Sequence, residues 1–218
     1  HAGIKNKYKI KIQWINARFS IGTLETIDGL IIPGGFGTTG IENMISLLNQ
    51  ARKQKTPTLG ICLGMQLMII EYCRNVLNIK DATSTEIDGI NGTNVVTSIK
   101  EEKKMGGSMR LGSKDIFLEE SKLSSIYKKK YITERHRHRY IINNEYIQLL
   151  NKHGCLISGF ATIKTEEKGN SRIIEAIEDE KHPWYIGCQY HPEYKSSPFN
   201  PHPLFVSFIK KCIENNSM

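Results

Sequence analysis

The stretch TLGICLGMQ, residues 58–66, constrains the fold more than any other part of this sequence. It places Cys62 between Gly60 and Gly64, after a short apolar run and before a run of helix-forming residues. Where a strand turns sharply into a helix, only glycine fits beside the residue at the turn, and that residue is presented at the carboxyl edge of the sheet. We therefore predict a buried strand over 58–61, a tight turn at Cys62 and a helix after it.

The segment before this turn has the same order of strand and helix. GLIIPGGFG, residues 29–37, predicts a short, fully buried strand that ends in a glycine-rich loop. Apolar residues at helical spacing follow it between 41 and 48. A strand-helix-strand-helix order is typical of a parallel sheet that is covered on both faces, so the predicted fold class is α/β.

Other segments add strands and a last helix to this core. YKIKIQWI alternates apolar and polar residues from Tyr8, as a strand with one buried face does. ERHRHRYII, from Glu134, is also strand-like, and NEYIQLLNKHG is read as a short helix closed by Gly154. Further strands are predicted around 115–118, 155–161, 173–177 and 185–190, with an amphipathic helix near the end. No linker divides the chain, so we predict one domain over residues 1–218.

Composition argues against several function classes. The sequence has no run of eighteen apolar residues, so we expect no membrane span. The net charge is +8, but the lysines lie in short runs without interleaved aromatic residues, which favours a solvated basic face over nucleic-acid binding. The five cysteines are scattered without metal-ligand spacing. We therefore expect free thiols and a cytoplasmic protein.

A second motif supplies partners for the cysteine. In GCQYHPEY, residues 187–194, His191 and Glu193 follow a predicted buried strand. A thiolate with a general base and an orienting acid is the arrangement of covalent acyl transfer, and the helix that begins behind Cys62 favours the thiolate. Taken alone, the cysteine fits a buried residue in a tight turn and His-Pro-Glu fits a surface turn. The two together, each at the end of a strand, favour catalysis.

The loop PGGFG, residues 33–37, offers a third element. A backbone N–H from this loop and that of Leu63 are candidates for the two donors that stabilise an oxyanion. The alternative is a phosphate-binding glycine loop. No Gly-Lys-Ser/Thr follows Gly37, so that alternative is not favoured.

The order of PGGFG, LGICLGMQ, STEI, GGSMRLG, ERHRHRY and HPEY resembles the glutamine amidotransferase domain of the CTP synthases, within the class I (triad) amidotransferases. The resemblance extends from HAGI at the start to HPLF near the end. It implies a flavodoxin-like three-layer sandwich with a mostly parallel central sheet and a cysteine nucleophile elbow. It also implies hydrolysis of L-glutamine to glutamate and ammonia.

The resemblance assigns roles to single residues. Cys62 attacks the side-chain amide of glutamine, His191 carries a proton to the leaving ammonia, and Glu193 orients His191. The residues matched to substrate binding are Gly35, Leu63, Gly64, Met65, Gln66, Glu86 and Arg139. Among them, Gly35 and Leu63 match the oxyanion donors. Glu86 matches the partner of the substrate ammonium and Arg139 the partner of its carboxylate, which a guanidinium binds well.

His136 and His138 alternate along ERHRHRY and would share one face of a strand, as metal ligands can. No acidic or thiol ligand is evident near them. We therefore expect ordinary packing, or contact with an absent domain, and no metal site.

The resemblance also implies partners outside this sequence. The chain starts at His1, and an amino-terminal synthetase domain that uses ATP, UTP and Mg²⁺ is absent from it. Glutamine hydrolysis itself needs no cofactor, GTP is the expected allosteric activator, and the full-length enzyme is expected to be a homotetramer. Thr39 stands where the family usually has arginine, so the response to GTP is expected to differ. The segment between Glu86 and Gly106 is shorter than in the family.

Two alternatives remain open at the level of sequence. One is another class I cysteine hydrolase, such as a γ-glutamyl peptidase, which shares the elbow and the base. The other is a non-catalytic nucleotide-binding or interaction module. Such a module has little need for a complete set of Cys62, His191 and Glu193.

Overall fold

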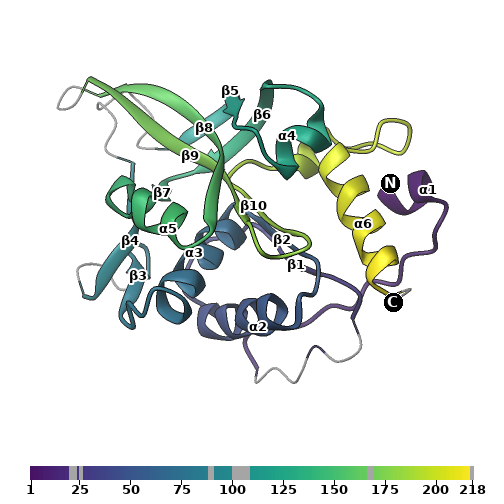
Figure 1. The fold of residues 1–218 in the computed structure, drawn as a ribbon, viewed down its shortest axis with the longest axis horizontal. Helices are drawn as coiled ribbons and strands as arrows, with labels where there is room; N and C mark the ends of the chain where they lie inside the picture. The colour runs from purple at the N-terminus through teal and green to yellow at the C-terminus, as the bar shows by residue number, and fades with distance from the viewer. Residues whose placement is uncertain (20–23, 25–26, 88–90, 100–108, 166–168, 217–218) are drawn as a thin grey trace.

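The computed structural model describes residues 1–19, 24, 27–87, 91–99, 109–165 and 169–216 (Figure 1). Its strands are β1 (Leu30–Ile32), β2 (Thr58–Ile61), β3 (Ala82–Ser84), β4 (Thr93–Ser98), β5 (Arg110–Leu118), β6 (Tyr131–His138), β7 (Tyr140–Ile142), β8 (Cys155–Thr165), β9 (Gly169–Asp179) and β10 (Tyr185–Cys188). Its helices are α1 (Ala2–Asn6), α2 (Ile41–Gln54), α3 (Leu63–Asn75), α4 (Lys122–Tyr127), α5 (Ile147–Lys152) and α6 (Pro203–Asn216), with 3-10 turns η1 (Asn144–Tyr146) and η2 (Pro192–Lys195).

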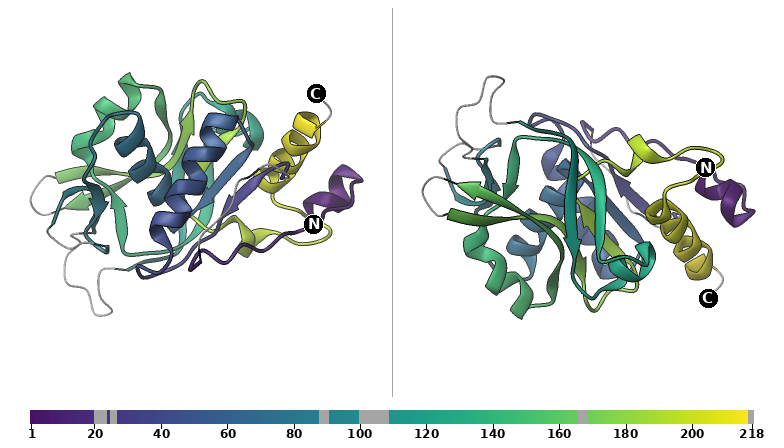
Figure 2. Two further views of the ribbon diagram at one scale, coloured as in Figure 1. Left: turned by 90° about the horizontal axis from the view of Figure 1, so that it is seen from below. Right: turned by 90° about the horizontal axis from the view of Figure 1, so that it is seen from above.

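The molecule has three layers, with a seven-stranded sheet in the middle. The strand order is β1-β2-β10-β9-β8-β5-β6, and a smaller sheet has the order β3-β4-β7. Helices α2, α3 and α5 bury one face of the large sheet in a core that includes Leu48 and Met65 (Figures 1 and 2). Helices α4 and α6 cover the other face over a second core that includes Ile186 and Leu204. The predicted α/β sandwich, with apolar burial on both sides of a sheet, is confirmed.

Strand direction changes across the large sheet. β1, β2 and β10 pair in parallel, as the strand-helix-strand-helix order predicts. The neighbours from β10 through β9, β8 and β5 to β6 pair antiparallel. Short connections account for two of these pairs, because the segments between β8 and β9 and between β9 and β10 are too short for a crossover such as α2, which parallel strands need. The parallel strands carry the predicted cysteine turn.

Two sequence-based predictions about the first part of the chain are wrong. The segment from Tyr8 forms no strand, and a short helix, α1, precedes it. Its alternating side chains find no strand partner among the described residues, so Ile12 is 68% exposed and Trp14 is 89% exposed. β1 is not buried on both faces either, because Ile31 is 41% exposed.

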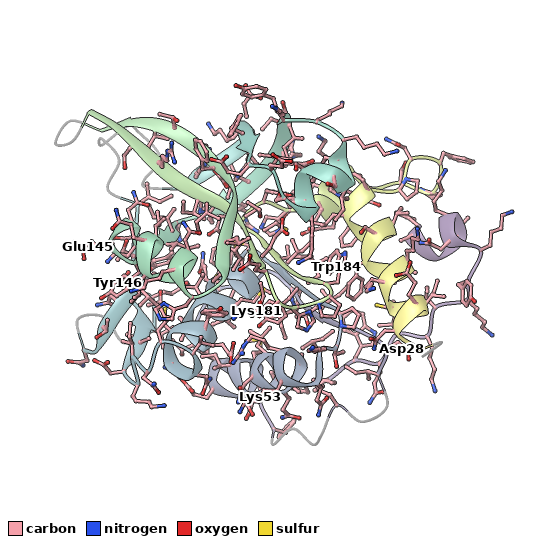
Figure 3. The ribbon with its side chains drawn as sticks, in the orientation of Figure 1. Asp28, Lys53, Glu145, Tyr146, Lys181 and Trp184 are labelled. Atoms are coloured by element: carbon pink, nitrogen blue, oxygen red, sulfur yellow. The ribbon has the colours of Figure 1, made fainter. Side chains whose placement is uncertain are left out.

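Helix α6 ties the beginning of the chain to the sheet. Nδ2 of Asn6 in α1 donates to the carbonyl oxygen of Val206 at 3.1 Å, and the two helices lie side by side in Figures 1 and 2. Trp184, which precedes β10, lies beside α6 (Figure 3), and its Nε1 donates to Oγ of Ser207 at 3.0 Å. In the part of the chain that the structure describes, every helix is too short or too polar to cross a bilayer.

Candidate active site

Cys62 sits at the turn between β2 and α3, as predicted. Its backbone has φ 52° and ψ −103°, a conformation that an L-residue adopts only under constraint. The thiol is almost fully buried, and the backbone N–H donates to the carbonyl oxygen of Cys188 in the adjacent strand at 2.7 Å. The strained residue is therefore held by the end of β10, which is the strand that leads to His191.

The two flanking glycines allow β2 and α3 to meet this closely. A Cβ on Gly64 would overlap the carbonyl oxygen of Ile32, and one on Gly60 would lie 2.8 Å from the backbone of Gly64. The carbonyl oxygen of Ile32 and the first turn of α3 cannot move apart without opening the turn at Cys62. The Gly-x-Cys-x-Gly spacing is thus required by contact between β1, β2 and α3.

His191 and Glu193 lie where β10 passes into η2. Nδ1 of His191 donates to Oε1 of Glu193 at 2.6 Å, and the backbone N–H of His191 donates to the carbonyl oxygen of Arg135 in β6. The ring of Tyr194 stacks on the imidazole, with centroids 4.9 Å apart. These contacts fix the tautomer and the plane of the imidazole, so that Nε2 is the nitrogen left for chemistry.

The electrostatic setting of His191 favours its protonated form. Burial alone would lower its pKa, but Cys62 and Glu193 beside it raise the pKa to about 9. Nε2 is buried and has no hydrogen-bond partner among the described residues. Gly34 leaves room for the ring, because a Cβ there would lie 2.8 Å from Cε1 of His191 and 3.5 Å from Cβ of Cys62. The imidazole and the thiol therefore share one glycine-lined space.

Besides His191, two polar groups of the described residues lie near the sulfur of Cys62. The sulfur lies 3.8 Å from the carbonyl oxygen of Arg137 and 3.6 Å from Nε2 of Gln189. Gln66, one turn into α3, donates from Nε2 to Oε1 of Gln189 and to the carbonyl oxygen of Tyr140, each at 3.2 Å. Both glutamine side chains are buried. The sulfur is thus surrounded by α3, β6 and the end of β10.

The two residues matched to oxyanion donors lie next to each other. A Cβ on Gly35 would be 3.3 Å from Cδ2 of Leu63, the first residue of α3. The N–H groups of a helix's first turn have no partner within the helix. The loop after β1 and the start of α3 therefore meet on one side of Cys62.

The other matched residues take different positions. Oε1 of Glu86 accepts from the N–H of Gly37, which joins it to the same glycine loop. Arg139 is exposed at the junction of β6 and β7, between the carbonyls of residues 137 and 140 that face Cys62 and Gln66. Met65 has its side chain fully buried in the core below the elbow. The stretch GGSMRLG is described only from Met109 onward, and its first three residues lie outside the described residues.

His136 and His138 share the buried face of β6, as predicted, but the expectation that no acidic residue lies near them is wrong. Antiparallel pairing of β8 with β9 brings in Glu175, and ligand atoms of all three lie within 4.8 Å of one another. Nε2 of His136 is 2.8 Å from Oε2 of Glu175, and Arg110 holds the other oxygen at 2.9 Å. Burial alone would raise the pKa of Glu175, but His136 and Arg110 lower it. Each oxygen of the Glu175 carboxylate thus has a partner, and the cluster forms a buried polar network in which His138 Nε2 has no hydrogen-bond partner among the described residues.

Glu134, the first residue of ERHRHRY, belongs to a separate polar cluster. Its Oε1 is 3.1 Å from Nε2 of His202 and accepts from the hydroxyl of Tyr127 at 3.2 Å. Nδ1 of His202 accepts the N–H of Leu204, which caps the start of α6. A cavity of about 700 Å³ adjoins this cluster, and none of Cys62, His191 and Glu193 lines it. Glu134 therefore fastens α6 to β6.

Several residues of the site are not evident from sequence reasoning. Gln189, Glu175 and Arg110 are buried polar residues, and Tyr194 stacks on His191. One usable signal is the single acidic residue in the apolar run IIEAI, because a lone charge in a buried strand needs a partner. The partner itself is set by strand register and cannot be read from spacing.

The chain is also similar to known proteins. Residues 1–211 match the family model described as glutamine amidotransferase class-I. The chain is similar to the CTP synthase of Hydrogenobaculum sp. (strain Y04AAS1), with 48% identity over 218 residues, and to that of Aquifex aeolicus (strain VF5), with 44% identity over 220 residues. These matches cover 97% and 98% of this chain.

A solved structure is also similar. It is the glutaminase domain of the Trypanosoma brucei CTPS with bound acivicin, with a TM-score of 0.88 and 31% sequence identity. The match covers 98% of this chain and 84% of that chain. In contrast, the present chain spans only 39% and 40% of the lengths of the two bacterial relatives.

Proposed function

This chain belongs to the class-I glutamine amidotransferase family, and on that premise we propose that residues 1–218 form one domain that hydrolyses L-glutamine to glutamate and ammonia. The proposed nucleophile is Cys62, the proposed acid and base is His191, and Glu193 orients His191. The observation that carries the proposal is the bond of 2.6 Å between His191 and Glu193, which leaves a buried, unpartnered Nε2 beside the strained Cys62.

The proposed reaction has two stages. The thiolate of Cys62 attacks the amide carbon of glutamine, and an S–C bond forms as the carbonyl oxygen becomes an oxyanion. The imidazolium of His191 gives its Nε2 proton to the leaving nitrogen, so ammonia departs and a glutamyl thioester remains. Water then attacks the thioester, His191 accepts its proton, and the S–C bond breaks to release glutamate. An imidazolium beside the sulfur favours the thiolate that starts the cycle.

The surrounding backbone and side chains would bind the substrate. The N–H groups of Gly35 and Leu63 are the proposed oxyanion donors, each worth on the order of 10² to 10³ in rate. Gly64, Met65 and Gln66 would form the wall behind the nucleophile, and the core position of Met65 makes its backbone the part that faces the substrate. We assign the substrate ammonium to Glu86 and the substrate carboxylate to Arg139. The guanidinium of Arg139 is exposed and forms no ion pair with the other described residues, so it is free to bind a carboxylate with two hydrogen bonds.

The remaining length of the relatives suggests where the ammonia goes. We propose that a synthetase domain of the same polypeptide uses it to convert UTP to CTP, with ATP and Mg²⁺ acting in that domain and none required for glutamine hydrolysis. A homotetramer, GTP activation and a cytoplasmic location are parts of the same proposal. Thr39, in the loop after Gly35, is the position at which the response to GTP is expected to differ.

The direct test is ammonia release from glutamine by the chain and by Cys62→Ala. We expect turnover by the parent and none above background by the variant, with the same thermal unfolding midpoint. Cys73→Ala is the matched control, because Cys73 is buried in α3 away from the site and its substitution leaves turnover in place. Equal turnover by Cys62→Ala and the parent would contradict the proposal.

A substrate panel separates the proposal from its alternatives. Free glutamine should be hydrolysed in preference to γ-glutamyl peptides, whereas the reverse preference indicates a γ-glutamyl peptidase. Stabilisation by GTP without any hydrolysis of either substrate indicates a non-catalytic module.

A further inference from the structure

Gln189 is a fully buried polar residue directly after β10, two positions before His191. Its backbone N–H donates to the carbonyl oxygen of Glu175 at 2.8 Å, so the sheet fixes its main chain. A buried amide side chain carries two donors and an acceptor and costs free energy unless they are paired. The partners of this side chain therefore indicate what it does.

A short chain of hydrogen bonds fixes which end of the Gln189 amide faces the sulfur. The carbonyl oxygen of Tyr140 can only accept, so Gln66 must present its Nε2 there, at 3.2 Å. The same Nε2 of Gln66 is 3.2 Å from the Gln189 side chain, which must offer its oxygen. The nitrogen of Gln189 is thereby turned toward Sγ of Cys62, at 3.6 Å.

This orientation matters because one neighbour of the sulfur, a backbone carbonyl oxygen, carries partial negative charge and disfavours a thiolate. The carbonyl oxygen of Arg137, 3.8 Å from Sγ, can accept an S–H but repels a negative sulfur. An amide N–H is a donor and attracts that negative charge. Of the two buried glutamines near the elbow, Gln189 is the one whose nitrogen lies against Sγ.

We propose that Gln189 is a further catalytic residue, whose Nε2 donates a hydrogen bond to the Cys62 thiolate and holds the sulfur in position for attack, with Gln66 and Tyr140 fixing its orientation. The inference rests on the proposed function in taking Cys62 as the nucleophile. It adds a donor to the sulfur itself, distinct from the donors that face the substrate oxygen. When the thioester forms, the sulfur loses its charge and the bond weakens, so the donor acts on the free enzyme.

The test measures the thiolate without using glutamine. Iodoacetamide alkylates a thiolate, forming an S–C bond as iodide leaves, and its rate against pH reports the thiolate fraction. The other cysteines are protected, because burial raises the pKa of Cys73 and of Cys212 to about 12 and also raises those of Cys155 and Cys188. Peptide mapping then shows both the site of reaction and whether the fold has stayed closed.

Three variants of Gln189 separate the donor from packing. Gln189→Met keeps the length and removes the donor, and Gln189→Glu keeps the shape and places an acceptor at the sulfur. Gln189→Asn keeps a donor at a shorter reach. We expect alkylation of Cys62 at pH 7 to slow about tenfold in Gln189→Met, more in Gln189→Glu, and less in Gln189→Asn. Gln54→Met, at an exposed position in α2, is the matched control and should keep the parental rate.

The outcomes are distinct. Rates within twofold of the parent for both Gln189→Met and Gln189→Glu, with adducts confined to Cys62, overturn the inference. If Gln189→Met opens the fold, adducts spread to the buried cysteines. In that case slower alkylation of Cys62 in Gln189→Glu than in Gln189→Asn supports the inference, and equal rates overturn it. A parent that releases no ammonia from glutamine contradicts the proposed function alone, because the alkylation rates still report on the sulfur.

Discussion

Nδ1 of His191 lies 2.6 Å from Oε1 of Glu193, although the first side chain is almost fully buried and the second is 43% exposed. The carboxylate thus reaches in from the solvent side and fixes a ring whose other nitrogen faces the interior. Such a pair holds the imidazole in one tautomer while its Nε2 stays beside the thiol. The pair connects the buried sulfur to the surface.

Replacing Glu193 by glutamine tests this connection. The new side-chain amide keeps a hydrogen-bond acceptor but removes the negative charge, so we expect kcat for glutamine hydrolysis to fall about 100-fold in Glu193→Gln. The pKa of His191 should fall from about 9 toward its ordinary value, because the charge of Glu193 is one of the causes that raise it. Titration of the His191 ring by NMR measures this shift. An unchanged titration and an unchanged kcat would show that Glu193 does not orient His191.

The close contact at the elbow predicts the cost of filling Gly64. Because a Cβ there overlaps the carbonyl oxygen of Ile32, Gly64→Ala should lower the free energy of unfolding by about 3 kcal/mol and reduce glutaminase activity. Gly112→Ala is the control, since Gly112 has φ +82° but open space around it, and strain alone should cost about 1 kcal/mol. Urea unfolding measures both. Equal losses of unfolding free energy for the two variants would show that a Cβ at Gly64 is accommodated without a steric clash.

The buried pair of Arg110 and Glu175 should be costly to break. Arg110→Met leaves a buried carboxylate without its guanidinium, and we expect a loss of about 3 to 5 kcal/mol in unfolding free energy. Adding Glu175→Gln should restore much of the loss, because the uncompensated charge is then gone. Lys210→Met, which breaks an exposed pair with Glu214, should change stability by less than about 0.5 kcal/mol. If Arg110→Met costs no more than Lys210→Met, the network does not stabilise the fold.

The buried His182 predicts a loss of stability in acid. Burial lowers its pKa to about 4, so the folded protein binds fewer protons than the unfolded chain below pH 6.5. Its contribution is fully present above about pH 6.5 and is lost as pH falls toward 4, by about 2 to 3 kcal/mol at pH 4.5.

His182→Asn should reduce this acid loss, because asparagine binds no proton in this pH range. The asparagine oxygen can still accept the N–H of Trp184, which in the parent donates to Nδ1 of His182 at 3.0 Å. The measurement is urea unfolding at pH 7 and pH 4.5. His153→Asn, at an exposed position, serves as the control and should leave the pH dependence unchanged. A parental pH dependence in His182→Asn would contradict the assignment.

The elements nearest the chemistry are those that the sequence predicts best. β2 has its predicted bounds, and the turn at Cys62 and the start of α3 follow from local sterics that three residues encode. His191 is found for a similar reason, because it lies three residues beyond the end of a short buried strand and its partner Glu193 lies two residues further on.

The contacts that sequence reasoning misses depend on distant pairing. Gln189 faces Cys62 only because β10 lies between β2 and β9, and Glu175 reaches Arg110 only because antiparallel strands bring them together. The strand predicted from Tyr8 is wrong for a related reason. The alternation of apolar and polar residues favours a strand locally, but a strand also needs a neighbouring strand to pair with, and the pattern does not show whether one is present.

The central claim is that Cys62 is the nucleophile for glutamine, and labelling with 6-diazo-5-oxo-L-norleucine, a glutamine-mimicking electrophile, tests it most directly. The measurement is intact-mass spectrometry followed by peptide mapping, with and without excess glutamine. We expect a single adduct, on Cys62, that excess glutamine prevents. No adduct on a folded sample, or adducts spread over several cysteines regardless of glutamine, would contradict the claim.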